Sequence, residues 1–380
     1  MLLKVRGKNL GHLTEDIKVV ALRPQDWLLE AARVSGFNAY KLVWELYFYF
    51  LVSGLTPDEY LRFRIYRRDL SLQRKRSFKG GRKFGKWIRK TLKRRKIENV
   101  DLIDDKLRFA DFSSGYGLRF PTHLAIYSET PLEYDYPNLE PTQKLISVAG
   151  ISDFLRRAEH YPIFGKPIHN ERALGSFGAK QYLARSDSVI FSDGREVPLE
   201  ELAAEIADKF PEGYIFQKHL VQAPELEKLF GSLPSIFRAT TIKFPGEKAK
   251  IWYIGGKISP AGSMASTSTN ARRFTVPVDT KSGRIFDLFS FHKYKNTTYE
   301  TFPDTDQNPR NVKLPNWEAI APQLPALHDA LGAYPVLGWD ICFTPEGPLI
   351  LEANYTPALE TSQQVNDVGI GDPAFASVFK

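Results

Sequence analysis

Two carboxylates and an amide in one short stretch of the chain are spaced so that they can act on the same ligand. Residues 335–354 consist of two apolar runs separated by a Pro-Glu-Gly turn, a pattern typical of a β-hairpin with a short loop. If Thr344 and Pro348 close this loop, Asp340 lies directly opposite Glu352. Asn354 then follows two residues later on the same face of the hairpin.

The rest of the hairpin leaves two interpretations of these acids. Its other face has no polar side chain, and we expect it to form core: Leu337, Trp339, Ile341, Phe343, Leu349, Leu351 and Ala353. Carboxylates that face each other across two strands destabilise a sheet unless positive charge lies between them. Carboxylate and amide oxygens suit a Mg²⁺ ion that keeps waters or binds phosphates. The alternative is a hairpin whose acids simply face water.

The composition is that of an ordinary globular protein. The chain has 380 residues, of which 43% are hydrophobic and 25% charged, enough for two or three compact units. Cys342 is the single cysteine, which excludes a disulfide framework and favours a reducing cytosol. Residues 1–13 mix Lys4, Arg6 and Lys8 with apolar residues, so we expect no signal peptide. These features predict a cytoplasmic protein.

One segment holds the excess positive charge. Residues 62–96 contain 17 lysines and arginines and one acid, a net charge of +16, so the remainder of the +8 chain sums to −8. Apolar residues are interleaved with these cations at Phe78, Phe84, Trp87 and Ile88. The charge density favours contact with nucleic acid, another anionic polymer or a membrane surface. The alternative is a solvated face whose aromatic side chains dock on the next domain.

Local patterns predict several helices. Residues 26–34 and 40–55 form two of them, and the second is almost wholly apolar but too short for a comfortable membrane span. We expect it to be buried; the alternative is an interfacial helix, because Trp44, Tyr47 and Tyr49 prefer lipid headgroups.

Helix signals recur further along the chain. Thr56-Pro-Asp-Glu is a helix-start pattern that leads into a helix over residues 60–69. Residues 87–96 predict an amphipathic basic helix, residues 199–209 an amphipathic helix with an acidic face, and residues 317–331 a helix limited by Pro322 and Pro325.

A lysine and a glycine-containing segment could bind phosphates, although each signal alone is weak. Lys166 ends a predicted strand and supplies a point charge. Before the next predicted strand, Gly175-Ser176-Phe177-Gly178 predicts a flexible loop that can fold over phosphates and present backbone N–H groups.

The order of these motifs resembles that of a known superfamily. Gly338-Trp-Asp-Ile, an apolar strand and Leu351-Glu-Ala-Asn resemble the metal-binding hairpin of ATP-grasp proteins, and more narrowly of the sugar-transfer-associated ATP-grasp branch. The resemblance covers about residues 99–366. It implies an α+β fold in which two lobes, each with an antiparallel sheet, clasp ATP and Mg²⁺. The implied division is a helical basic region (1–98), a first lobe (99–215) and a second lobe (216–380).

The resemblance also implies roles for individual residues. Asp340, Glu352 and Asn354 would hold the metal. The nucleotide would be bound by Lys106, Lys166, Gly175, Ser176, Gly178, Gln217, Lys218, Leu220 and Glu225. Of these, Gln217, Lys218 and Leu220 would line the adenine pocket, and Glu225 would contact the ribose. The candidate catalytic residues are Arg238, Lys257 and Arg272, and Arg272 lies at the end of a small, polar segment that we expect to act as a substrate lid.

The implied activity is that of an ATP-dependent carboxylate–amine ligase. A carboxylate would become an acylphosphate, and an amine would then displace the phosphate to form an amide, on a substrate linked to a sugar or a cell-surface polysaccharide precursor. One alternative is a kinase of the same fold that phosphorylates a hydroxyl. Another is a nucleic-acid- or membrane-binding module that uses residues 62–96. We expect the protein to be cytoplasmic, and a position at the periphery of the membrane is the alternative left open. The two substrates and the oligomeric state are left open.

Overall fold

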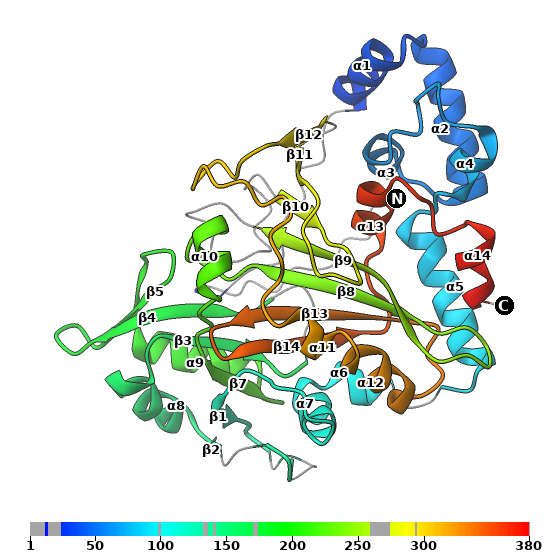
Figure 1. Ribbon diagram of the computed structural model, residues 1–380. Helices are drawn as coiled ribbons and strands as arrows, with labels where there is room; N and C mark the ends of the chain where they lie inside the picture. The colour runs from blue at the N-terminus through cyan, green and yellow to red at the C-terminus, as the bar shows by residue number, and fades with distance from the viewer. Residues whose placement is uncertain are drawn as a thin grey trace.

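The computed structural model describes residues 12–13, 24–97, 100–130, 132, 136–139, 142–169, 174–258, 274–292 and 295–379. Within these residues a helical region precedes two β-sheets, and the helices of residues 24–94 lie on the side of the second sheet away from the first (Figure 1). The predicted α+β class, with two largely antiparallel sheets and a helical N-terminal region, is confirmed. The boundaries after residues 98 and 215 stay predictions.

Helices make up the described chain before the first sheet: α1 Pro24–Ser35, α2 Ala39–Ser53, α3 Pro57–Arg62, α4 Leu72–Ser77, α5 Gly81–Arg94, α6 Asp101–Asp104 and α7 Lys106–Ser114. Thr56 caps α3 as predicted, because its hydroxyl accepts from the Glu59 N–H at 3.2 Å and its own N–H donates to the Glu59 carboxylate at 2.7 Å. The predicted helix over residues 60–69 is wrong: α3 ends at Arg62, and Arg64 adopts a φ of +52°, which a right-handed helix cannot include.

The predicted apolar helix over residues 40–55 is α2, and the expectation that it is buried is wrong. Only Leu42, Tyr49 and Ser53 are buried along its length, whereas Trp44 is 71% exposed. Among the described residues, α2 has neighbours on one side only, because it lies at the end of the molecule (Figure 1). Within the described residues, no helix combines the length and the apolar character needed to cross a bilayer.

The predicted basic helix is α5, which begins earlier than expected, at Gly81. Its apolar side joins the core of the second sheet through Phe84, Ile88 and Leu92. At its other end Arg94 and Arg95 donate to the carbonyls of residues 379 and 378, at 2.7 Å each. Aromatic residues of the basic segment therefore dock on the protein, as one of the two alternatives predicted, and contact with an anionic partner stays a prediction.

The first sheet has the strand order β2-β1-β7-β3-β4-β5-β6 in the described residues, and its one parallel pair is β1–β2. The strands are β1 His123–Tyr127, β2 Gln143–Leu145, β3 Ile163–Pro167, β4 Phe177–Leu183, β5 Ser188–Phe191, β6 Glu196–Pro198 and β7 Tyr214–Lys218. The helices α8 Val148–Leu155 and α9 Leu199–Lys209 pack on one face, and a 3₁₀ turn spans Ala158–His160. Helix α9 has the predicted bounds.

The second sheet is antiparallel, with the order β12-β11-β10-β9-β8-β13-β14 among the described strands. They are β8 Ile236–Ile242, β9 Lys250–Ile258, β10 Phe274–Pro277, β11 Leu288–His292, β12 Lys295–Tyr299, β13 Val336–Thr344 and β14 Gly347–Asn354. The helices of this part are α10 Pro224–Phe230, α11 Trp317–Ile320, α12 Gln323–Leu331, α13 Glu360–Asn366 and α14 Pro373–Ala376, followed by a 3₁₀ turn at Ser377–Phe379. The prediction of a single helix over residues 317–331 is therefore wrong. Residues 321–322 separate α11 from α12, and Pro322 has no N–H to donate to a continuous helix.

A chain of buried hydrogen bonds fixes β13 against β8 and α12. The Trp339 indole N–H donates to the Thr241 hydroxyl at 2.8 Å, and that hydroxyl lies 2.7 Å from His328 Nδ1. His328 Nε2 lies 2.9 Å from the Tyr334 carbonyl oxygen, which can only accept, so Nε2 carries the proton and Nδ1 accepts. The chain satisfies polar groups deep in the core and so fixes the position of β13.

Candidate functional site

The β13–β14 hairpin carries the predicted acidic pair. Asp340 is paired with Glu352 across the two strands, as predicted, and Asn354 is paired with Gly338. The Asn354 side-chain N–H donates to Glu352 Oε1 at 3.2 Å. The three candidate metal ligands therefore lie on one face of the second sheet.

The path of the hairpin differs from the prediction by one residue. Thr344 pairs with Gly347 instead of the next residue, and its hydroxyl donates to the Gly347 carbonyl at 2.8 Å. A β-bulge nearer the acids leaves Leu351 without a partner and restores the predicted acidic pair. Between the turn and the bulge Ile350 pairs with Ile341 and enters the core cluster, whereas the predicted Leu349 is buried outside that cluster and Leu351 is half-buried.

An arginine on the adjacent strand meets the acidic pair. Arg238 on β8 lies opposite Asp340, and its Nε and Nη2 each donate to that carboxylate at 2.5 Å. The same guanidinium lies 3.9 Å from Glu352 Oε1. Burial raises the pKa of Asp340, but the charges of Arg238 and Lys257 outweigh burial and hold this pKa below its usual value. Asp340 is therefore ionised at neutral pH, and the repulsion expected in the hairpin is offset.

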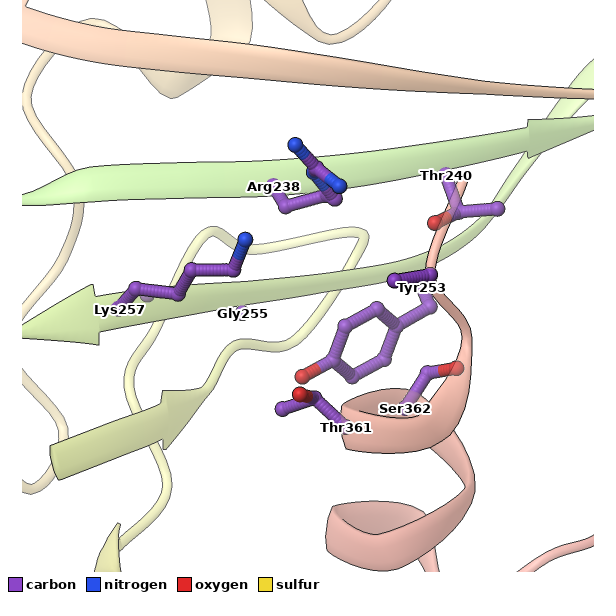
Figure 2. Close-up of a pocket in the computed structure, with 9 residues that line it drawn as sticks. Arg238, Thr240, Tyr253, Gly255, Lys257, Thr361 and Ser362 are labelled. Carbon is purple, nitrogen blue, oxygen red and sulfur yellow. The ribbon is translucent and has the colours of Figure 1, made fainter. Parts of the chain in front are cut away.

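Next to this ion pair lies a small cavity on the same face of the sheet. Its lining comes from β8, β9, α13 and the segment just before α13: Arg238, Thr240, Tyr253, Gly255, Gly256, Lys257, Ala358, Thr361 and Ser362. It holds about 10 Å³ of space for the centre of a water-sized molecule, which is enough for one water. Figure 2 shows the Lys257 ammonium and the Arg238 guanidinium on the same side of β8 and β9.

Two hydroxyls of the cavity lack a hydrogen-bond partner within the described part of the chain. They are the hydroxyls of Thr240, which is 1% exposed, and of Tyr253, which is 6% exposed. The Tyr253 hydroxyl is directed to the side of the cavity that Thr361 lines (Figure 2). A buried hydroxyl without a partner is destabilising, so these groups indicate a polar occupant of the cavity.

The two candidate phosphate-binding lysines lie close together, one on the first sheet and one on the helix that precedes it. Lys106 opens α7 and donates to the Ile168 carbonyl at 2.8 Å. Lys166 stands on β3 and is half-buried. Burial and the charge of Lys106 lower the pKa of Lys166 to about 8, while Glu352 acts in the opposite direction. Lys166 therefore lies within electrostatic reach of Glu352 on the acidic hairpin.

The residues predicted to line an adenine and ribose pocket are only partly brought together. Gln217 is buried on β7 and is paired with Phe164 on β3. It shares a face with Lys166, because Lys166 lies two residues after Phe164 on the same strand. Lys218 is exposed and Leu220 half-buried. Glu225 is exposed in the first turn of α10, and within the described chain it makes no side-chain hydrogen bond or ion pair.

The predicted glycine loop has a different structure. Phe177 and Gly178 belong to β4, and Phe177 is in the core of the first sheet, so the expected flexible loop over these residues is wrong. Gly175 and Ser176 are buried before this strand, and the Tyr214 hydroxyl donates to the Gly175 carbonyl at 2.7 Å. Gly175 has a φ of +75°, and a side chain there would collide with the Phe210 ring. Residues 170–173 lie outside the described residues.

One candidate catalytic residue has no described position. Arg272 and the predicted lid lie in residues 259–273, outside the described residues. Arg238 and Lys257, the other two candidates, lie on neighbouring strands on the same face.

Several residues around the site were not predicted. Thr240 lies two residues after Arg238 on β8, and Tyr253 four before Lys257 on β9, so strand alternation could have placed both on the same face. His123 on β1 has no such signal; burial and the charge of Lys166 lower its pKa to about 4, so it is neutral at pH 7.

Solved structures of other proteins resemble parts of the chain. Three of them each match 73% of this chain. D-alanyl-alanine synthetase A from Vibrio cholerae is 13% identical, with 64% of that chain covered and a TM-score of 0.42, and an N5-carboxyaminoimidazole synthetase from Staphylococcus aureus is 8% identical, with 51% covered and a TM-score of 0.40. The biotin carboxylase domain of a Hydrogenobacter thermophilus 2-oxoglutarate carboxylase, crystallised with MgADP and bicarbonate, is 11% identical, with 45% covered and a TM-score of 0.39. The match thus spans between about half and two thirds of those chains. No protein of curated function matches the sequence significantly.

The family comparison covers most of the chain. Residues 86–374 match the sugar-transfer associated ATP-grasp family, a range that includes both sheets, the acidic hairpin and the candidate phosphate-binding lysines. The chain therefore belongs to the sugar-transfer associated ATP-grasp family.

Proposed function

We propose that the protein is an ATP-dependent carboxylate–amine ligase that forms an amide through an acylphosphate. The observation that carries the proposal is the cluster of charges across the two sheets. Lys166, whose pKa is lowered by burial and by Lys106, lies within electrostatic reach of Glu352, which is paired with Asp340 on the hairpin. Two lysines that can bind phosphates thus lie near two carboxylates that can bind a metal ion, and the chain belongs to an ATP-grasp family.

The donor set of the hairpin fits a magnesium ion. Asp340, Glu352 and Asn354 offer hard oxygen donors on one face. Among the described residues, no group of three or more Asp, Glu, His or Cys side chains is arranged so that it could hold a metal ion by itself. Mg²⁺ is usually bound by only one or two protein carboxylates, and waters or phosphate oxygens occupy its other coordination positions. Each oxygen of Asp340 accepts from Arg238 and has a further lone pair for an ion. When bound, the ion would neutralise charge on the β- and γ-phosphates.

The protein's own residues then position the reactants. Lys106 and Lys166 would hold the phosphates of ATP, and Gln217 would lie beside them on the same sheet. Arg238 and Lys257 would attract the acceptor carboxylate and keep it near the γ-phosphate. Such preorganised positive charge is the main way a protein accelerates phosphoryl transfer. The amine would then attack the acylphosphate carbon and displace phosphate, which leaves an amide, ADP and phosphate.

The cavity beside Arg238 supports a polar acceptor. Its two unpartnered hydroxyls, on Thr240 and Tyr253, can bond to hydroxyl or carboxylate oxygens of the acceptor once the cavity opens. A hydroxylated, anionic acceptor matches the family's association with sugar transfer, and we propose a sugar acid or an amino acid destined for a cell-surface polysaccharide precursor. We place this reaction in the cytoplasm, where ATP is supplied.

Hydroxylamine trapping tests the chemistry. The purified chain is incubated with MgATP, hydroxylamine and panels of sugar acids and amino acids, and hydroxamate and ADP are measured together. We expect an ATP-dependent hydroxamate with at least one carboxylate. Release of ADP with a phosphorylated hydroxyl and no hydroxamate would instead identify a kinase.

Matched variants connect the activity to the hairpin. Glu352→Gln removes a candidate metal ligand whose side chain is partly exposed, and Glu227→Gln changes an exposed acid on α10. We expect the first to weaken MgATP binding at least tenfold in calorimetric titration and the second to leave it unchanged. Equal MgATP affinity in both variants would contradict the assigned role of the hairpin.

A further inference from the structure

Helix α2 exposes an apolar surface that the proposed ligase does not use. Its most exposed large side chains are those of Tyr40 (83%), Trp44 (71%) and Leu51 (60%). We define its outer face as Tyr40, Val43, Trp44, Tyr47, Phe48, Phe50 and Leu51, all of them exposed. At 100° per residue these side chains occupy a continuous arc of about 160°, and the buried residues of α2 lie opposite. An apolar helix that is half uncovered in this way indicates a partner surface.

Positive charge borders the outer face. The Lys41 ammonium lies 3.7 Å and the Arg68 guanidinium 4.8 Å from the ring centre of Phe37, next to the start of α2. The Arg76 guanidinium lies 5.5 Å from the ring centre of Phe48. All three cations are exposed. The partner surface therefore combines apolar and negatively charged groups.

The acidic group of α2 is turned away from this surface. Glu45 accepts from the Tyr60 hydroxyl at 2.6 Å and pairs with Lys75 at 3.5 Å, inside the helical cluster. Residues 24–97 as a whole contain 19 lysines and arginines and 6 aspartates and glutamates, a net charge of +13. A negatively charged surface would thus be attracted from a distance as well as at contact.

The length of α2 determines how it could meet a membrane. Its 15 residues extend about 22 Å, less than the roughly 30 Å of a hydrocarbon core. Tryptophan and tyrosine favour the level of the headgroups, and lysine and arginine favour anionic lipids. We propose that the outer face of α2 docks on the surface of an anionic lipid bilayer, with the helix lying in the plane of the headgroups.

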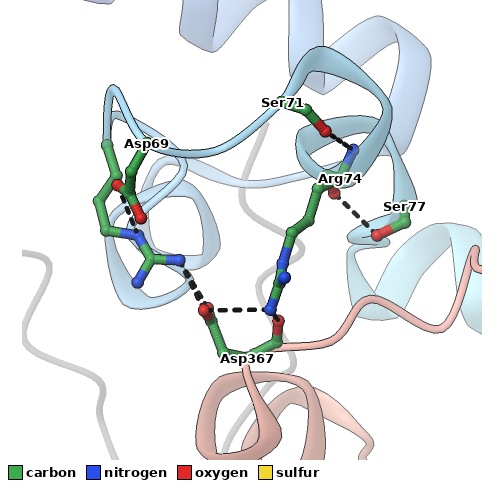
Figure 3. A network of polar contacts seen from close by, with 6 residues as sticks. Asp69, Ser71, Arg74, Ser77 and Asp367 are labelled. Atoms are coloured by element: carbon green, nitrogen blue, oxygen red, sulfur yellow. Dashed lines mark hydrogen bonds and ion pairs between the residues drawn. The ribbon is translucent and has the colours of Figure 1, made fainter.

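The docking helix is firmly connected to the rest of the protein. Below α2, Arg67 and Arg74 both contact Asp367 at the end of α13, at 2.7 Å to its carboxylate and 2.9 Å to its carbonyl oxygen respectively (Figure 3). Helix α13 also lines the cavity next to Arg238. A bilayer bound at α2 would therefore hold the candidate acceptor cavity in a fixed orientation to the membrane.

Vesicle sedimentation tests the proposal with the full chain. The probes are vesicles of phosphatidylcholine alone and vesicles in which about one third of the lipid is phosphatidylserine. We expect binding to the anionic vesicles, and we expect Trp44→Ser/Leu51→Ser to weaken it at least tenfold because two inserted side chains are lost. Lys41→Gln/Arg76→Gln should weaken binding to the anionic vesicles and reduce its salt dependence, because the two cations next to the outer face are lost.

The control changes exposed apolar residues elsewhere on the protein. Tyr116 and Val221 are 51% and 58% exposed, and Tyr116→Ser/Val221→Ser should bind vesicles like the wild type. MgATP affinity measured without vesicles should be the same in all of these variants, so this test is independent of the ligase proposal. Absent vesicle binding, or equal binding by the α2 variants and the control, would overturn the proposal. A dimer in solution that the α2 variants dissociate, without vesicle binding, would assign the outer face to a second copy of the chain.

Discussion

Replacement of Lys166 by methionine should make the nucleotide-free protein more stable and its binding of MgATP weaker. The ammonium of Lys166 is destabilised in the native state, because burial and the nearby charge of Lys106 oppose it. Methionine has a similar length and no charge, so it fills the same space without this penalty. A residue that is unfavourable for folding but provides a cation for phosphates is expected at a functional site.

The size of the effect follows from the pKa of Lys166. This pKa is lowered from 10.5 to about 8, which corresponds to about 3 kcal/mol of destabilisation of the charged form. Because the side chain is half-buried, solvent screens part of the penalty, and we expect Lys166→Met to raise the free energy of unfolding by about 1–3 kcal/mol at pH 7. The loss of one charge-assisted hydrogen bond of about 1.5–3 kcal/mol should weaken MgATP binding about 10- to 100-fold.

Two measurements on the same samples check these values. Urea unfolding without nucleotide gives the stability, and calorimetric titration gives the MgATP affinity. Lys180→Met is the matched control, because Lys180 stands on the neighbouring strand β4 and is exposed; it should change neither quantity. The gain of Lys166→Met should shrink as the pH rises from about 8 to 10.5, since the native lysine of the wild type then becomes neutral before the unfolded one.

The reasoning would be refuted by a Lys166→Met protein that is less stable than the wild type and binds MgATP with the same affinity. That result would make Lys166 a structural residue of the first sheet, with no part in nucleotide binding.

Three further predictions concern the elements that position the site. Thr241→Val should lower the free energy of unfolding in urea by about 2–4 kcal/mol, because it leaves the Trp339 indole and His328 Nδ1 without partners; an unchanged midpoint would contradict this. Burial lowers the pKa of His328 to about 4, so its neutral form stabilises the protein above pH 6.5, and about 3 kcal/mol should be lost as the pH falls from 6.5 to 4. His328→Gln, compared with the wild type at both pH values, should show a smaller loss. Gly165→Ala should lower the melting temperature, equivalent to about 1–3 kcal/mol, since the added methyl group collides with the Phe177 ring; an unaltered melting curve would rule out this packing.

The sequence predicted those features that depend on residues close to one another along the chain. Strand alternation placed Asp340 opposite Glu352, and the Thr56 capping pattern located the start of α3. The β-bulge that restores the acidic pair was beyond such reasoning, because a bulge depends on how β14 meets its surroundings and not on alternation. The expected loop was consequently wrong by one residue, although the pair it implied was right.

Features that depend on distant residues could not be derived in this way. The Arg238–Asp340 ion pair joins residues 102 positions apart and requires that β8 lie next to β13. Hydrophobicity alone predicted that α2 is buried, but burial also needs neighbours on both sides, and those are set by tertiary packing. The proximity of Lys166 to Glu352 similarly follows from the way the two sheets face each other.

The packing of α5 against residues 373–379 has a consequence for how the chain is made. Arg94 and Phe379, which are joined by a hydrogen bond, are 285 residues apart. At about 5–20 residues per second, a ribosome needs roughly 15–60 s between them. During that interval the apolar side of α5 has emerged while its partners Phe375 and Phe379 have not yet been translated. Until these partners have been synthesised, the nascent polypeptide therefore exposes a cationic, aromatic helix. Chaperones that recognise such segments can bind the helix during this interval.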